Sequence, residues 1–122
     1  MNQELTDLAV EMRRLSLLVD RALQVLREAS RDHSQHEHHY RKERGKAWAT
    51  TAGQGMVVAE REALVDSLTA DARLSRDLAA GLERAALEAV RARRQQLSAL
   101  QSLLAGWREE AAFSRTGPEL RP

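Results

Sequence analysis

The residues best suited to chemistry are four basic side chains near the middle of the chain. They are Arg41, Lys42, Arg44 and Lys46. Cationic groups contact phosphates, and the neighbouring rings of Tyr40 and Trp48 could stack on bases, so this segment predicts a single-stranded nucleic-acid site. The alternative is that the cations only compensate the dipole at a helix C-terminus.

A second group of arginines lies in the last third of the chain. Its members are Arg84, Arg91, Arg94 and Arg108. Their spacing places them on one face of a helix, so Arg91 and Arg94 are predicted as further phosphate contacts. The alternative is a solvated flank whose long side chains cover the edge of an apolar seam.

All four histidines lie in one run, at positions 33, 36, 38 and 39. The heptad register described below would place His33, His36 and Tyr40 on the seam. The string does not have the spacing of a zinc-protease helix, and we predict no metal site. One alternative is a polar end of the seam, with His38 and His39 solvated, and another is an interface that responds to pH, because imidazoles titrate near neutrality.

Catalytic patterns are missing from the sequence. Gly53-Gln54-Gly55 lacks the third glycine and the strand of a dinucleotide fingerprint, and no Ser/His/Asp arrangement can be argued. Cysteine is absent, which removes thiolate nucleophiles and disulfides. We therefore expect a protein that is not an enzyme and needs no cofactor.

The elements that must position these residues are long helices. Apolar side chains follow a 3,4 spacing through the first segment: Leu5, Leu8, Met12, Leu15, Val19, Ala22, Leu26 and Ala29. This is the seam of a coiled coil. We predict a single domain with a long helix over 1–49, a glycine loop over 50–56, a helical segment over 57–114 and a disordered tail over 115–122.

The second helical segment has a less regular pattern. One register runs through Leu64, Leu68, Asp71, Ser75, Leu78 and Leu82. A cleaner seam resumes at Val90, which indicates a register shift near 82–90. The shift corresponds to a stutter, a kink or a break into two helices, and a break would lie near 67–71 or at Gly81. We predict that the cleaner seam is the oligomer interface, formed by Leu97, Leu100, Leu104 and Trp107.

The composition supports this helical reading. The 122 residues include 20 alanines and 18 leucines but no isoleucine, and aromatic residues make up 3%. Strands favour β-branched and aromatic residues, so the composition favours an all-α fold. There is no apolar run long enough to span a membrane and no signal-peptide pattern, so we expect a soluble protein. The net charge of +1 combines two basic segments, +2 over residues 31–46 and +2 over residues 80–122, with an excess of acidic residues in the rest of the chain.

The order of these features resembles the bacteriophage recombination mediators similar to UvsY. The resemblance covers roughly residues 20–117 and lies in the basic stretch 40–48, the glycine loop 53–55, the segments 59–62 and 68–71, and the C-terminal 109–113. It implies an all-helical protein that binds single-stranded DNA, forms rings through C-terminal helices and helps to load a recombinase onto strands coated by single-strand-binding protein. Lys42, Arg44 and Lys46, with Arg41 adjacent, match the DNA-contacting stretch.

Together these observations predict an elongated helical hairpin or coiled coil of two to three long helices, assembled as a homo-oligomer. The expected function is that of a single-stranded DNA-binding recombination mediator in the cytoplasm of a bacterial host. The alternative is a coiled-coil scaffold or adaptor, for example in phage assembly, that binds no nucleic acid.

Overall fold

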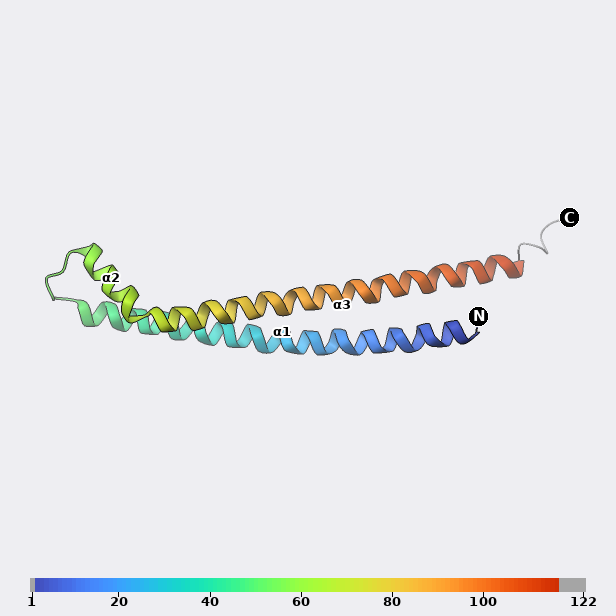
Figure 1. Ribbon diagram of the computed structural model, residues 1–122, viewed down its shortest axis with the longest axis horizontal. Helices are drawn as coiled ribbons and strands as arrows, with labels where there is room; N and C mark the ends of the chain where they lie inside the picture. The colour runs from blue at the N-terminus through green and yellow to red at the C-terminus, as the bar shows by residue number, and fades with distance from the viewer. Residues whose placement is uncertain (1, 117–122) are drawn as a thin grey trace. The chain divides into compact units, whose positions relative to one another are not determined.

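The computed structural model describes residues 2–116 and shows three α-helices in that range (Figure 1). These are α1 (Asn2–Thr51), α2 (Val58–Leu68) and α3 (Ala70–Thr116). No strand occurs among the described residues, so the predicted all-α class is confirmed. The first two residues of the predicted tail belong to α3, and the rest of that tail lies outside the described residues.

The helices divide into two compact units. Unit 1 joins the described residues up to Leu23 with those from Glu88 onward, and unit 2 spans Gln24–Leu87. Each unit therefore pairs a part of α1 with a part of α3, and unit 2 also holds α2. Within residues 2–116, no helix carries an apolar stretch long enough to cross a bilayer.

Unit 1 buries the apolar residues of the N-terminal pattern. Leu8, Leu15 and Val19 of α1 are buried, and so is Val90 of α3. These α1 positions are separated by seven and four residues, which brings them to one face of the helix. Because burial of each such side chain stabilises the fold by about 1.5–3 kcal/mol, this apolar face holds unit 1 together.

The inward face of α3 differs from the predicted one. In residues 70–87 the covered positions that share one face of the helix are Ala72, Ser75, Arg76, Ala79, Glu83 and Ala86. Leu68, Leu78 and Leu82 of the predicted register are exposed instead. The spacing of four and three residues continues without interruption from Ala72 through Val90, so the predicted register shift near 82–90 is wrong.

The break in the second helical segment falls at Thr69. Its φ of −109° and ψ of 10° lie outside the helical range, and α2 ends before it. The hydroxyl of the buried Thr69 donates to the carbonyl of Val65 over 2.8 Å, which holds the bend in place. Of the two predicted break points, the structure has the one near 67–71, while α3 continues through Gly81.

The loop before α2 depends on two glycines. Gly53 and Gly55 have φ values of 77° and 70°, a region that disfavours side chains. They reverse the chain so that α2 returns toward the start of α3, beside the last turns of α1 (Figure 1). The side chain of Val65, in α2, is fully buried there.

Candidate nucleic-acid interface

The predicted basic cluster of α1 is split between two faces of the helix. Arg44 points towards α2, where its Nη1 donates to Asp66 Oδ1 over 2.7 Å. That hydrogen bond is the main cause that raises the pKa of the Arg44 guanidinium above its ordinary value. Arg44 is therefore occupied in joining α1 to α2, which leaves it less available for phosphate than its sequence position suggests.

The other three members of the cluster face solvent. Arg41 has a 77% exposed side chain and donates to Glu37 over 2.9 Å, and Lys46 lies 3.4 Å from Glu43. These are pairs within one helix surface, and exposed pairs of this kind contribute about 0–1 kcal/mol. Lys42 is exposed and forms no ion pair with any residue between 2 and 116. A phosphate could therefore displace the carboxylates at low cost.

The outer face of α1 carries a longer line of such groups than the sequence indicated. It consists of exposed side chains spaced seven, four and four residues apart: Arg31, His38, Lys42 and Lys46. On a regular helix this spacing keeps them within roughly an 80° arc. We call this set the outer cation line. Arg31 and His38 were not predicted from the sequence, because the prediction considered a contiguous basic segment and not the residues that share one face of the helix.

The two aromatic rings beside the cluster already have cationic neighbours. The guanidinium of Arg76 lies 4.2 Å from the centre of the Tyr40 ring, and that of Arg61 lies 4.5 Å from the centre of the Trp48 ring. Arg61 also donates to Thr51 Oγ1 over 3.0 Å and to the carbonyl oxygen of Trp48. Each ring thus has one face covered within unit 2, where it forms part of the packing.

The histidine run is also divided by the helix surface. His33 is half-buried, with Nδ1 3.3 Å from Glu83 Oε1 of α3. His36 is exposed, so its predicted place on the seam is wrong. The inner face here passes through Glu37, one position later, because a straight helix drifts from a strict heptad. Among the described residues no group of His, Asp and Glu has the arrangement of a metal site.

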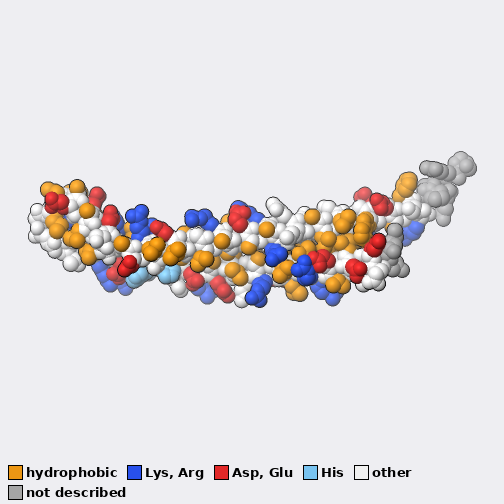
Figure 2. Space-filling model, in the orientation of Figure 1, with side chains coloured by type: hydrophobic (Ala, Val, Ile, Leu, Met, Phe, Trp, Pro, Cys, Tyr) orange, Lys and Arg blue, Asp and Glu red, His pale blue; other side chains and the backbone are white. Residues whose placement is uncertain are grey.

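In the second predicted group of arginines, Arg84 lies in unit 2, whereas Arg91, Arg94 and Arg108 lie in unit 1. Arg91 and Arg94 are both exposed in unit 1, whereas the outer cation line lies in unit 2. Arg91 donates to Glu88 over 2.8 Å in a pair on the same helix. Figure 2 shows basic and acidic side chains interspersed over the visible face, without a large field of one sign.

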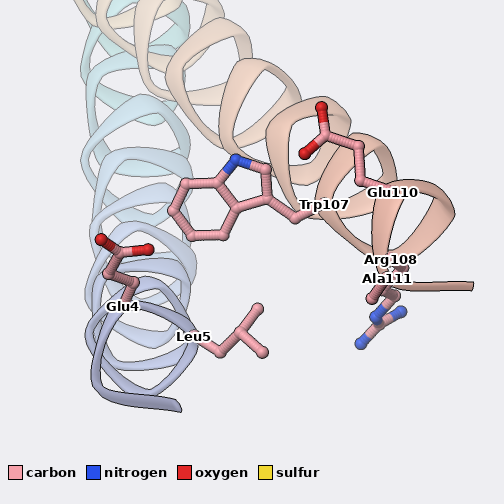
Figure 3. Close-up of a pocket in the computed structure, with 6 residues that line it drawn as sticks. All are labelled: Glu4, Leu5, Trp107, Arg108, Glu110 and Ala111. Atoms are coloured by element: carbon pink, nitrogen blue, oxygen red, sulfur yellow. The ribbon is translucent and has the colours of Figure 1, made fainter. Parts of the chain in front are cut away.

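The predicted oligomer interface lies on the inward face of α3 in unit 1. Leu97, Leu100, Leu104 and Trp107 are all partly covered. Figure 3 shows the indole of Trp107 reaching towards α1, where Leu5 lines the same cavity of about 190 Å³. That volume is below the ~300–1,000 Å³ typical of small-molecule sites, so the cavity is a packing gap between two helices.

No protein-family model, curated protein or solved structure matches this chain.

Proposed function

We propose that this chain is a non-enzymatic, oligomeric helical protein that binds single-stranded DNA through the outer cation line of α1. The observation that supports this is the exposed row Arg31, His38, Lys42 and Lys46, whose inner neighbours fix α1 against α2 and α3. No exposed acidic side chain stands within that arc between residues 31 and 46. Rigid placement keeps the cations aligned, and phosphates carry the matching charge.

A single row of this size gives weak binding. Each phosphate contact with a single strand changes the slope of the logarithm of the binding constant against the logarithm of the salt concentration by roughly −0.7. Assembly would place several rows near one strand, and binding of one row would raise the effective concentration of the others. We propose that the partly covered apolar face of unit 1 contributes to a coiled-coil assembly, with Leu97, Leu100, Leu104 and Trp107 in the contact.

The resemblance to phage recombination mediators supports the finer proposal. A protein that binds single strands as an oligomer could help a recombinase to replace single-strand-binding protein. The chain has a long helix α1, a loop with two glycines, and then the helices α2 and α3. Bacterial cytoplasm is the proposed location.

The decisive experiment is fluorescence anisotropy with a labelled oligothymidine at low salt and at ~0.2 M salt. The double variant Lys42→Ala with Lys46→Ala should bind more weakly and show a shallower salt slope. The matched control, Arg13→Ala with Arg21→Ala, removes two cations from α1 in unit 1 and should leave the slope unchanged. Absence of binding by the wild type at low salt would overturn the proposal.

A scaffold or adaptor that binds no nucleic acid is the second candidate. It is favoured by the ion pairs that neutralise Arg41, Arg44 and Lys46. Under this reading the two double variants behave alike in anisotropy, while the oligomer mass stays that of the wild type.

A further inference from the structure

Three leucines on α3 of unit 2 are largely exposed in the described chain. Leu74, Leu78 and Leu82 are 59%, 61% and 67% exposed, and they follow one another at intervals of four residues. Side chains four apart lie on neighbouring positions of one helix face. They therefore form a single apolar stripe, which we call the leucine stripe.

The inward face of the same segment of α3 carries small and charged residues, in contrast to the leucine stripe. Ala79 and Ala86 are buried, and the charged side chains of Arg76 and Glu83 are partly covered beside them. A lone exposed leucine needs no explanation, whereas several on one line mark an interaction surface. In this part of α3 the buried positions are thus small alanines, while Leu74, Leu78 and Leu82 are exposed.

Gly81 supplies a second observation at the same place. It lies at the edge of the stripe, beside Leu78 and Leu82, inside α3, and its φ is not positive. A Cβ at this position would meet only Arg84 Nη2, at 3.9 Å. The chain thus needs no glycine there for conformation or for space, although glycine inside a helix lowers its stability. What the glycine creates is a notch beside the stripe where another helix backbone can approach closely.

We infer that the leucine stripe binds the same stripe of a second copy of this chain, with the two α3 helices antiparallel and crossing at Gly81. The charges beside the stripe identify this occupant and this direction. Asp77 and Arg84 are seven residues apart, so they occupy the same flank of the stripe with opposite signs.

An antiparallel pair centred between residues 80 and 81 brings Asp77 of each copy opposite Arg84 of the other. The two-fold axis repeats this contact on the other side, so both pairs form at once. Leu78 and Leu82 then alternate along the contact with their counterparts. A parallel pair in register would give no such charge match.

Both charged groups are available for these contacts. Arg76 bonds to Asp77 through Oδ1 only, so the Oδ2 oxygen has no bond to any residue in 2–116, and 56% of the side chain is exposed. Arg84 is exposed and forms no ion pair within the same range. This inference stands apart from DNA binding, since it uses none of the cations of α1.

The first test is the mass of the protein by sedimentation equilibrium without DNA. The variant Leu78→Ser with Leu82→Ser should weaken self-association at least about tenfold, because both side chains would leave the contact. The control is Val10→Ser with Leu17→Ser, two exposed apolar positions in unit 1 that should not alter the mass. Circular dichroism must show unchanged helicity for both. A stripe variant that associates like the wild type, or a wild type that is monomeric throughout, overturns the inference.

The second test reads the direction of the helices. Asp77→Arg alone and Arg84→Asp alone should each weaken association, because every cross-pair becomes repulsive. A mixture of the two variants should associate again, because each mixed pair sets two basic side chains of one copy against two acidic side chains of the other. A mixture that stays dissociated rules out the antiparallel arrangement.

The third test asks whether the two helices approach closely at Gly81. Gly81→Leu should weaken association severalfold while raising helicity, and Gly106→Leu in the same helix serves as the control. Equal association by the two glycine variants would show that no close crossing occurs at Gly81. Anisotropy with oligothymidine on these variants separates this result from the proposed function, because the outer cation line remains in each.

Discussion

In unit 1 the covered positions of α1 and α3 are mainly apolar, whereas in unit 2 many of them carry charged or aromatic groups. Leu15 and Val90 represent the first kind, and Arg76 with Glu37 and Tyr40 represents the second. The apolar residues that unit 2 could have used for its interior stand on the outside of α3. The difference teaches that one pair of helices can be held by burial in one part and by directional contacts in another.

The energetic consequences of the two designs differ. Apolar burial is non-directional and, unlike a contact between charges, it is not screened by ions. Contacts of arginine with aromatic rings and carboxylates depend on geometry and are screened by ions. Unit 2 should therefore open more readily than unit 1 when ionic strength rises, which hydrogen exchange can follow segment by segment.

The largest expected effect is in the apolar face of unit 1. Leu15→Ala should reduce the free energy of unfolding by about 3 kcal/mol, because the residue is 5% exposed and leaves a cavity. Urea denaturation followed by circular dichroism measures the loss. Leu17→Ala, two residues away and exposed, is the control and should change stability by less than about 0.5 kcal/mol. A similar loss in both variants would mean that unit 1 is not held by this face.

The next effect concerns the directional contacts of unit 2. Arg61→Ala should cost about 1–2 kcal/mol, because it removes the ring contact with Trp48 and the hydrogen bond to the buried Thr51. Hydrogen exchange should show faster opening of α2, with little change in unit 1. Arg73→Ala, an exposed arginine of α3, is the control. Uniform acceleration in both units would contradict the separation described here.

A smaller effect distinguishes two kinds of glycine. Gly53→Ala should destabilise the loop of unit 2 by about 1–2 kcal/mol, because a side chain is strained at positive φ. Gly106→Ala, inside α3 in unit 1, should stabilise by about 0.5–1 kcal/mol, because a Cβ meets nothing within 4 Å. Thermal unfolding measures whether each variant has a lower or a higher melting temperature than the wild type. A change in the same direction in both variants would contradict the different roles of the two glycines.

Sequence reasoning was strongest where packing is apolar. The 3,4 spacing of Leu8, Leu15 and Val19 identified the inward face of α1 correctly, and the glycine loop followed from residue type. It failed on the first half of α3, where Leu78 and Leu82 attracted the predicted seam. The true inward line, containing Arg76 and Ala79, is not recognisable from hydrophobicity. Counting back from Val90 in steps of four and three would have found it.

The candidate site was predictable only in part. A run of basic residues is visible in the sequence, but the division of that run by the helix surface depends on what lies opposite. Arg44 faces Asp66 because the glycine loop returns α2 beside the end of α1, a long-range arrangement that local spacing does not encode. The exposure of Arg31 and His38 has the same origin. The face of α1 that packs against the other helices determines which residues lie on its outer face.

The smallest expected effect is a pH dependence in unit 1. The hydrogen bonds from Arg14 lower the pKa of Glu11, so the folded carboxyl binds its proton at a lower pH than in the unfolded chain. The pair therefore adds stability above the usual glutamate range and loses it as the pH falls through the folded pKa. Because both side chains are largely exposed, the gain is small. The melting temperature of Arg14→Ala should be slightly below that of the wild type at pH ~7, and the difference should shrink as the pH falls below the usual glutamate range, with Arg13→Ala as the control. An Arg14→Ala deficit that persisted at the acid end would show that Arg14 acts through the packing of its side chain and not through its charge.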